Sequence, residues 1–175
     1  EYAAAMGRAG ANVLGIDLSS KALSVAQLHA LEAQTPHVDY REVSAEDLAV
    51  QQPGQFDVVT CLEMLEHVPE PSSIVAACRT LVKPDGEVLF STINRNPKAF
   101  ALAIVGAEYL LRMLPRGTHQ YEKLIRPAEL ATWSRDAGLA VQDMTGLVYN
   151  PITQVYRLHP TDVGVNYFMR TCPAA

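Results

Sequence analysis

The sequence predicts an α/β domain with a parallel sheet and helices on both of its faces. Short apolar runs typical of strands alternate along the chain with longer stretches typical of helices. The run Phe56–Leu62 is apolar and β-branched, as expected for a central strand buried on both faces. The chain has 175 residues, 49% hydrophobic and 19% charged, which suits one globular domain. We therefore expect residues 1–175 to form a single domain.

The first half of the chain alternates regularly. The expected elements are a helix at residues 1–8, a strand at 12–16, a helix at 21–34, a strand at 38–43 and a polar turn at 44–47. Gly10 can supply the left-handed residue that ends the first helix. Ser19 or Ser20 can cap the second helix, because a serine hydroxyl accepts a bond from a free N–H of the first turn.

The second half repeats the alternation and then becomes rich in strands. We expect a strand at 56–62, a helix at 72–82, a strand at 87–93, a helix at 97–114, a loop at 115–125, a helix at 127–137 and strands within 139–172. Strand–helix alternation predicts parallel strands joined by right-handed crossovers. Ligands of such sheets bind beyond the carboxyl ends of the strands, which singles out Asp17, residues 45–46 and residues 62–67.

Two of these positions suit a nucleoside ligand. Asp17 ends a strand, where a carboxylate can accept two hydrogen bonds from a ribose diol. Its alternative role is to cap the helix that follows. Ala45 and Glu46 follow the next strand, where a backbone N–H and an acid could bind an adenine edge. A solvated turn is the alternative there.

The segment after residue 62 carries the most concentrated chemistry. Glu63, Glu66 and His67 share one face if they lie on a helical turn, because their spacings are three and four. Two carboxylates and an imidazole suit a divalent cation such as Mg²⁺, Mn²⁺ or Zn²⁺. The alternative is a turn with solvated acids and a histidine bonded to the backbone.

Two further features remain open. His119 lies in a loop and could act as a general base, since imidazole titrates near neutrality, or could simply bond the backbone. Residues 97–114 are apolar with Lys98 and Arg112 among them. They could lie in a membrane interface or cover the active site as a core helix.

Charge and cysteine content narrow the class of protein. A net charge of −5 and a pI near 5.5 give no basic field for nucleic acid. The three cysteines form no CxxC pair, which indicates reduced thiols in a cytosolic protein rather than a disulfide framework. The chain begins at Glu1 inside a helix-like segment, so we expect a portion of the protein to precede it.

Several motifs resemble a known family. "GIDLS", "FDVVTCLEMLEHVP" and "LVKPDG" are similar to segments of class I S-adenosylmethionine-dependent methyltransferases. "STINRN", "VGAEY" and "GLVYNPIT" resemble the O-methyltransferases of ubiquinone biosynthesis in particular, and the resemblance covers nearly the whole chain. The family's first strand and glycine-rich loop have no counterpart here.

The resemblance implies a function. It implies that Asp17, Leu18, Ala45, Glu46 and Leu62 bind S-adenosylmethionine. It further implies that Glu63, Glu66 and His67 bind a divalent metal, most simply Mg²⁺. The acceptors would be polyprenyl catechols and demethylubiquinol. The enzyme would work in the cytoplasm at the inner membrane, or on the mitochondrial matrix side in a eukaryote, and a ubiquinone-biosynthesis complex is an expected partner.

The same residues leave other functions open. A nicotinamide-dependent oxidoreductase also places an acid at the end of its second strand, although hydride transfer gives the turn at residues 62–67 no task. A methyltransferase acting on another small molecule is a second alternative, and an inactive lipid-associated scaffold is a third. We expect this chain alone to bind the methyl donor poorly, because the family's glycine-rich loop is absent from it.

Overall fold

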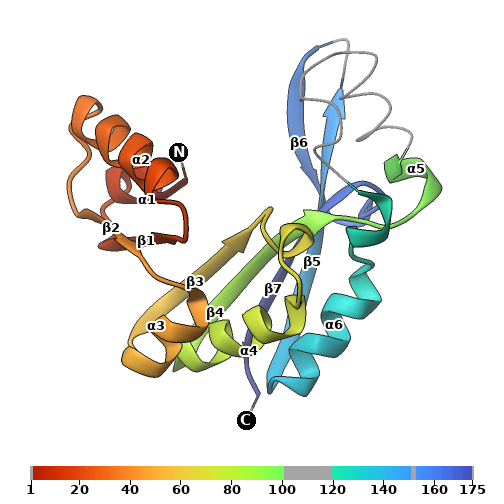
Figure 1. Ribbon diagram of the computed structural model, residues 1–175. Helices are drawn as coiled ribbons and strands as arrows, with labels where there is room; N and C mark the ends of the chain where they lie inside the picture. Colours follow the sequence, from red (N-terminus) through yellow and green to blue (C-terminus); the bar gives the residue numbers. More distant parts are fainter. Residues whose placement is uncertain (1, 101–119, 151–152, 175) are drawn as a thin grey trace. The chain divides into compact units, whose positions relative to one another are not determined.

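The computed structural model describes residues 2–100, 120–150 and 153–174 (Figure 1). The chain divides into two compact units, Glu1–Gln51 and Gln52–Ala175. The expectation of a single domain stays a prediction, and each unit is described by itself. The first unit contains α1 (Tyr2–Arg8), β1 (Val13–Asp17), α2 (Ser20–Glu32), β2 (Val38–Glu42) and α3 (Ala45–Gln51).

The first unit is built on two parallel strands. β1 pairs with β2 from Val13 opposite Val38 to Asp17 opposite Glu42. α2 begins after Ser19, whose hydroxyl accepts a hydrogen bond from the N–H of Ala22 at 3.2 Å. Gly10 has φ 96°, the left-handed conformation expected of the residue that ends α1. The predicted helices and strands of this half are therefore confirmed.

The polar turn predicted at residues 44–47 is wrong, because a helix begins there. The Ser44 hydroxyl accepts a bond from the Asp47 N–H at 3.0 Å and donates to the Asp47 carboxylate at 2.8 Å. A serine three residues before an acid is a helix-start pattern, since it satisfies N–H groups that the first turn leaves unpaired. Leu48 and Ala49 are buried on the resulting helix.

The second unit contains a five-stranded sheet. Its elements are β3 (Phe56–Leu62), η1 (Leu65–His67), α4 (Pro71–Leu81), β4 (Val82–Ile93), α5 (Pro97–Ala99), η3 (Tyr121–Lys123), α6 (Pro127–Asp136), β5 (Leu139–Asn150), β6 (Val155–His159) and β7 (Asn166–Pro173). The strand order is β3-β4-β7-β5-β6. β3 and β4 are parallel, whereas β7, β5 and β6 each pair antiparallel with their neighbours. The predicted parallel pairing is thus confirmed for two strand pairs and wrong for the last three strands, which no crossover helix separates.

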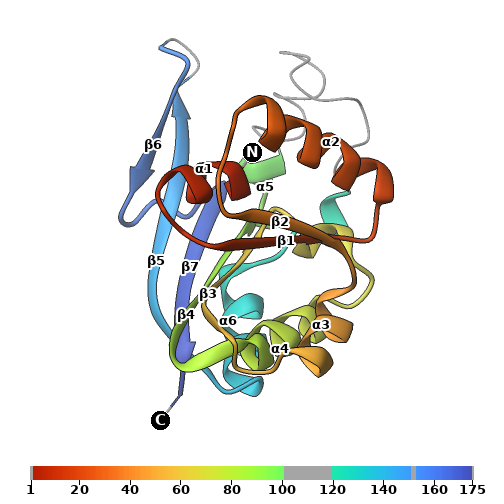
Figure 2. The ribbon, with the colours of Figure 1, turned by 90° about the vertical axis from the view of Figure 1, so that its left-hand side faces the viewer.

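Helices α4 and α6 lie together on one side of this sheet (Figure 2). The side chains of Val88, Phe90 and Thr92 on β4 are fully buried, as are those opposite them on β7, which are Thr171, Met169 and Tyr167. The Ser134 hydroxyl of α6 contacts the Met169 sulfur at 3.9 Å, which identifies this as the helix-covered face. Ser91, between Phe90 and Thr92, therefore belongs to the other face.

β3 is the edge strand of its sheet in the described part of the chain. Cys61 is buried, but Val58 is 56% exposed, so the prediction of a strand buried on both faces is wrong for this unit. Among the described residues no helix has the length and apolarity to cross a bilayer. Of the helix predicted at 97–114, only α5 and Phe100 lie within the described residues.

Candidate functional site

The chain turns sharply at the carboxyl end of β3. Glu63 has φ 50°, in the left-handed region that residues other than glycine seldom adopt. Its N–H donates to the carbonyl of Ser91 at 3.0 Å and lies 3.2 Å from the Ser91 hydroxyl. The short helix η1 begins only at Leu65. Glu63 therefore lies outside that helix, in a backbone conformation held by β4.

The Glu63 carboxylate lies at the meeting point of three strands. Its Oε1 accepts a hydrogen bond from the Ser91 hydroxyl at 2.8 Å, and its Oε2 is 3.4 Å from the Asn166 amide nitrogen. Ser91 belongs to β4, and Asn166 is the first residue of β7. The half-buried carboxylate thus stands beside the carboxyl ends of β3 and β4, where ligands of such sheets bind.

The Glu66 carboxyl group occupies a different place. The residue is only 3% exposed, and its Oε2 accepts a hydrogen bond from the Thr92 hydroxyl at 2.8 Å. Its Oε1 is buried with no donor among the described residues. Burial raises the pKa of Tyr167, opposite Thr92, and the nearby Glu129, Glu66 and Glu63 carboxylates raise it further. Glu66 thus faces the helix-covered core.

The two glutamates consequently do not share a face. They bond to Ser91 and Thr92, successive residues whose side chains leave β4 on opposite sides. His67 is exposed, and no three His, Cys, Asp or Glu side chains within residues 2–100, 120–150 and 153–174 are grouped to hold a metal. The helical spacing argument fails because Glu63 is left-handed and outside η1. Glu63, Glu66 and His67 therefore do not fit the predicted Mg²⁺ site in this structure.

The predicted nucleoside-binding residues lie in the first unit. Asp17 is the exposed last residue of β1, and its Oδ1 accepts a bond from the Ser19 N–H at 2.7 Å, so it takes part in the start of α2. Leu18 is 72% exposed. Ala45 and Glu46 open α3, and the Val43 N–H donates to the Asp17 carbonyl at 3.3 Å, which joins the ends of β1 and β2. Their roles in cofactor binding stay predictions.

Two predicted residues remain, Leu62 and His119. Leu62 is the partly buried last residue of β3 and pairs with Ser91. His119 lies outside the described residues. Sequence reasoning missed Ser91, Thr92 and Asn166, because only strand pairing brings them to the turn.

Comparison with known proteins identifies the family. A family model described as a methyltransferase domain matches residues 1–90. The ubiquinone biosynthesis O-methyltransferase of Stutzerimonas stutzeri is 62% identical over 167 residues, which are 95% of this chain and 71% of that protein. That of Albidiferax ferrireducens is 63% identical over 166 residues, 95% of this chain and 66% of that protein.

The chain belongs to the ubiquinone biosynthesis O-methyltransferase family. Solved structures support the class I methyltransferase fold. Magnesium protoporphyrin IX methyltransferase from Synechocystis, with bound S-adenosylhomocysteine, has a TM-score of 0.68 at 19% identity, covering 98% of this chain and 68% of that one. A methyltransferase from Methanosarcina mazei has a TM-score of 0.69 at 16% identity, covering 97% and 85%.

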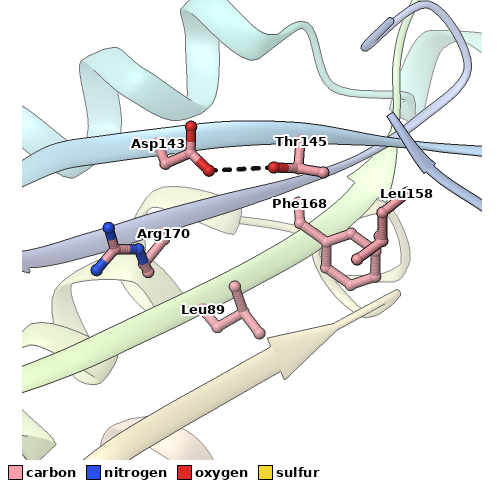
Figure 3. Close-up of a pocket in the computed structure, with 6 residues that line it drawn as sticks. All are labelled: Leu89, Asp143, Thr145, Leu158, Phe168 and Arg170. Carbon is pink, nitrogen blue, oxygen red and sulfur yellow. Dashed lines mark hydrogen bonds between the residues drawn. The ribbon is translucent and has the colours of Figure 1, made fainter. Parts of the chain in front are cut away.

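A separate hollow lies on the other face of the sheet in this O-methyltransferase chain. It measures about 280 Å³ and is lined by Leu89, Asp143, Thr145, Leu158, Phe168 and Arg170 from four strands (Figure 3). The Thr145 hydroxyl and the Asp143 carboxylate are 3.1 Å apart at one end. None of the residues predicted from the sequence lines it.

Proposed function

We propose that the whole protein transfers a methyl group from S-adenosylmethionine to a catechol hydroxyl of a polyprenyl dihydroxyphenol or of 3-demethylubiquinol. The observation that carries the proposal is 62% identity, over 95% of the chain, to a protein named for this biosynthesis. Further support comes from Asp17 and Glu63, which stand at the carboxyl ends of β1 and β3 in their respective units.

The reaction is an in-line displacement in which a phenolic oxygen bonds to the methyl carbon, the carbon–sulfur bond breaks with its electron pair left on sulfur, and the hydroxyl proton passes to the Glu63 carboxylate. When bound, S-adenosylmethionine supplies the electrophilic methyl group. Asp17 would bind the ribose diol through its carboxylate. Because a phenol titrates near pH 10, its hydroxyl needs a hydrogen-bond acceptor, and Glu63 supplies one that Ser91 and Asn166 hold in place.

Two predicted contributions have no step in this proposal. The role of His119 as a general base stays a prediction, since the residue is outside the described residues. No step is assigned to a divalent cation, because the proposed ligands face different sides of β4.

The cofactor part is tested with Asp17→Asn in the intact enzyme. Asparagine keeps an oxygen for the Ser19 N–H, so the start of α2 survives, but it loses the second acceptor that a ribose diol needs. The matched control is Asp39→Asn, an exposed acid in the middle of the paired strand. We expect S-adenosylmethionine affinity, measured by calorimetry, to fall about tenfold in the first variant only. Equal affinities in both variants would remove Asp17 from the ribose site.

The acceptor part is tested with Glu63→Gln. We expect kcat/KM for the catechol to fall about a hundredfold while S-adenosylmethionine affinity stays unchanged. A wild-type enzyme that binds S-adenosylmethionine but methylates no polyprenyl catechol would indicate another acceptor. One that does not bind S-adenosylmethionine would indicate a scaffold.

We also propose that the enzyme works at the cytoplasmic surface of the inner membrane, or on the matrix side in a eukaryote, where its lipid-soluble acceptor and a biosynthetic complex would be found. Support comes from the relatives' names and from the apolar sequence at 97–114, most of it outside the described residues. Liposome co-sedimentation should weaken in Leu110→Asp with Leu111→Asp. Unchanged binding by the folded variant would contradict an interfacial role for this segment.

A further inference from the structure

The segment at residues 94–98, directly after β4, holds the loop at residues 160–165 between β6 and β7. The Asn94 amide donates to the carbonyl of Val163 at 2.9 Å, and the Asn96 amide donates to the carbonyl of Gly164 at 2.9 Å. The backbone N–H of Asn94 adds a bond to the carbonyl of Val165 at 2.7 Å. Three consecutive carbonyls of the loop are therefore bound by one short segment, which we call the anchor segment.

An ion pair completes the attachment. Lys98 Nζ lies 3.1 Å from each oxygen of the Asp162 carboxylate, and the Gly164 N–H donates to one of them at 3.0 Å. The Lys98 ammonium, together with the Gly164 N–H, lowers the pKa of Asp162 below its ordinary value. On its other side the loop rests on β5, since a side chain at Gly146 would come within 1.7 Å of the Asp162 carbonyl. The loop is thus fixed from two directions.

The loop leads straight to the proposed acceptor site. It ends at Asn166, which begins β7 opposite Ile93 and whose amide lies 3.4 Å from Glu63 Oε2. Because Asn166 directly follows Val165, a fixed loop helps to set where this amide lies. Ser91, the other partner of Glu63, is held within β4.

The anchor segment also holds the chain on its other side. Arg95 donates to the carbonyl of Glu122 at 3.0 Å and pairs with the Glu129 carboxylate. The Ile125 N–H donates to the carbonyl of Ile93 at 3.0 Å. Two stretches far apart in sequence, residues 122–129 and 160–165, are thereby fixed to the carboxyl end of β4, where a ligand of the sheet would lie.

We propose that Asn94, Asn96 and Lys98 are positioning residues for the methyl acceptor, which act by fixing the 160–165 loop and, through it, Asn166 against Glu63. The inference rests on the proposed function and extends it from Glu63 to the segment that orients its surroundings. It concerns acceptor binding rather than ribose binding, because Asp17 belongs to the first unit and none of these contacts involves that unit.

The test measures KM for the catechol acceptor, KM for S-adenosylmethionine and kcat in the intact enzyme. Asn94→Asp keeps the shape but replaces the donor to Val163 with an oxygen, and Asp162→Asn removes the charge that Lys98 binds. The matched control is Asp57→Asn, because Asp57 and Lys83 form an exposed Asp–Lys pair at 2.7 Å near the opposite ends of β3 and β4.

We expect acceptor KM to rise about tenfold in Asn94→Asp, and severalfold in Asp162→Asn, because small displacements of positioning groups carry large kinetic costs. KM for S-adenosylmethionine should stay within about twofold of wild type, and Asp57→Asn should match wild type.

Two outcomes would overturn the inference while leaving the proposed function intact. One is an active wild type in which Asn94→Asp and Asp162→Asn behave like Asp57→Asn. The other is an equal loss of affinity for both substrates with a lowered melting temperature, which would mean a merely structural role. A wild type that methylates no catechol overturns the proposed function first, and this result is distinct from either.

Discussion

Replacing Thr92 with valine tests whether Glu66 faces the core or a metal. Thr92 is fully buried, and its hydroxyl is the donor to Glu66 Oε2, while Oε1 has no donor among the described residues. Valine keeps the shape of threonine but removes the hydroxyl, so the buried carboxyl group would lose the hydrogen bond that it accepts among the described residues. A buried polar group left unsatisfied costs about 1–3 kcal/mol, and the complete loss here places the expected cost near the top, at about 3 kcal/mol.

Thr171→Val is the matched control. Thr171 is also fully buried, but its hydroxyl donates to a neutral group, the Val88 carbonyl, at 3.2 Å. Losing that bond should cost about 1 kcal/mol. Urea unfolding of the intact protein, followed by circular dichroism, measures both costs. The difference of about 2 kcal/mol corresponds to a melting temperature lower by about 4–8 °C.

The reasoning fails if Thr92→Val costs no more than Thr171→Val. Thr92 would then not hold the Glu66 carboxyl group, which could turn toward Glu63. The predicted three-ligand metal site would again be possible.

Three further predictions follow from the same structure. Alkylation with mass spectrometry should modify the half-buried Cys172 before Cys61 and Cys78. The latter two are buried, and contact with Cys78 and burial raise the pKa of Cys61 well above its ordinary value, so equal rates would contradict their packing. The Lys98–Asp162 pair should stabilise the 160–165 loop above pH 3.8, the ordinary pKa of aspartate, and lose this effect as the pH falls through the lower folded pKa. Hydrogen-exchange protection of the loop should fall in that range in wild type but not in Asp162→Asn. Millimolar Mg²⁺ should leave the melting temperature unchanged, since a bound ion would raise it.

Much of the fold followed from local patterns. Gly10 and Ser19 mark helix ends through chemistry that acts within a few residues, and the structure confirms both. Ser44 and Asp47 carry an equally local signal, which the polar-turn interpretation overlooked. The antiparallel order of the last strands had no such signal, because β7 enters the sheet between β4 and β5 through contacts distant in sequence.

The family motifs were more informative about chemistry than about geometry. They correctly indicated a methyltransferase, since the family was confirmed by relatives across 95% of the chain. On β4, the partners of Glu63 and Glu66 lie 28 and 26 residues away, and Asn166 on β7 is farther still from Glu63. Residue spacing within the turn could not reveal them.

The left-handed backbone at Glu63 explains why spacing misled. Residues three apart share a face only when the intervening backbone is helical. With φ 50° at Glu63 and η1 starting at Leu65, the turn directs Glu63 toward Ser91 and Glu66 toward Thr92. One strand thereby separates a carboxylate beside the carboxyl ends of β3 and β4 from one in the core. An acidic pair that looks like a single ligand set in the sequence can thus lie in two different environments.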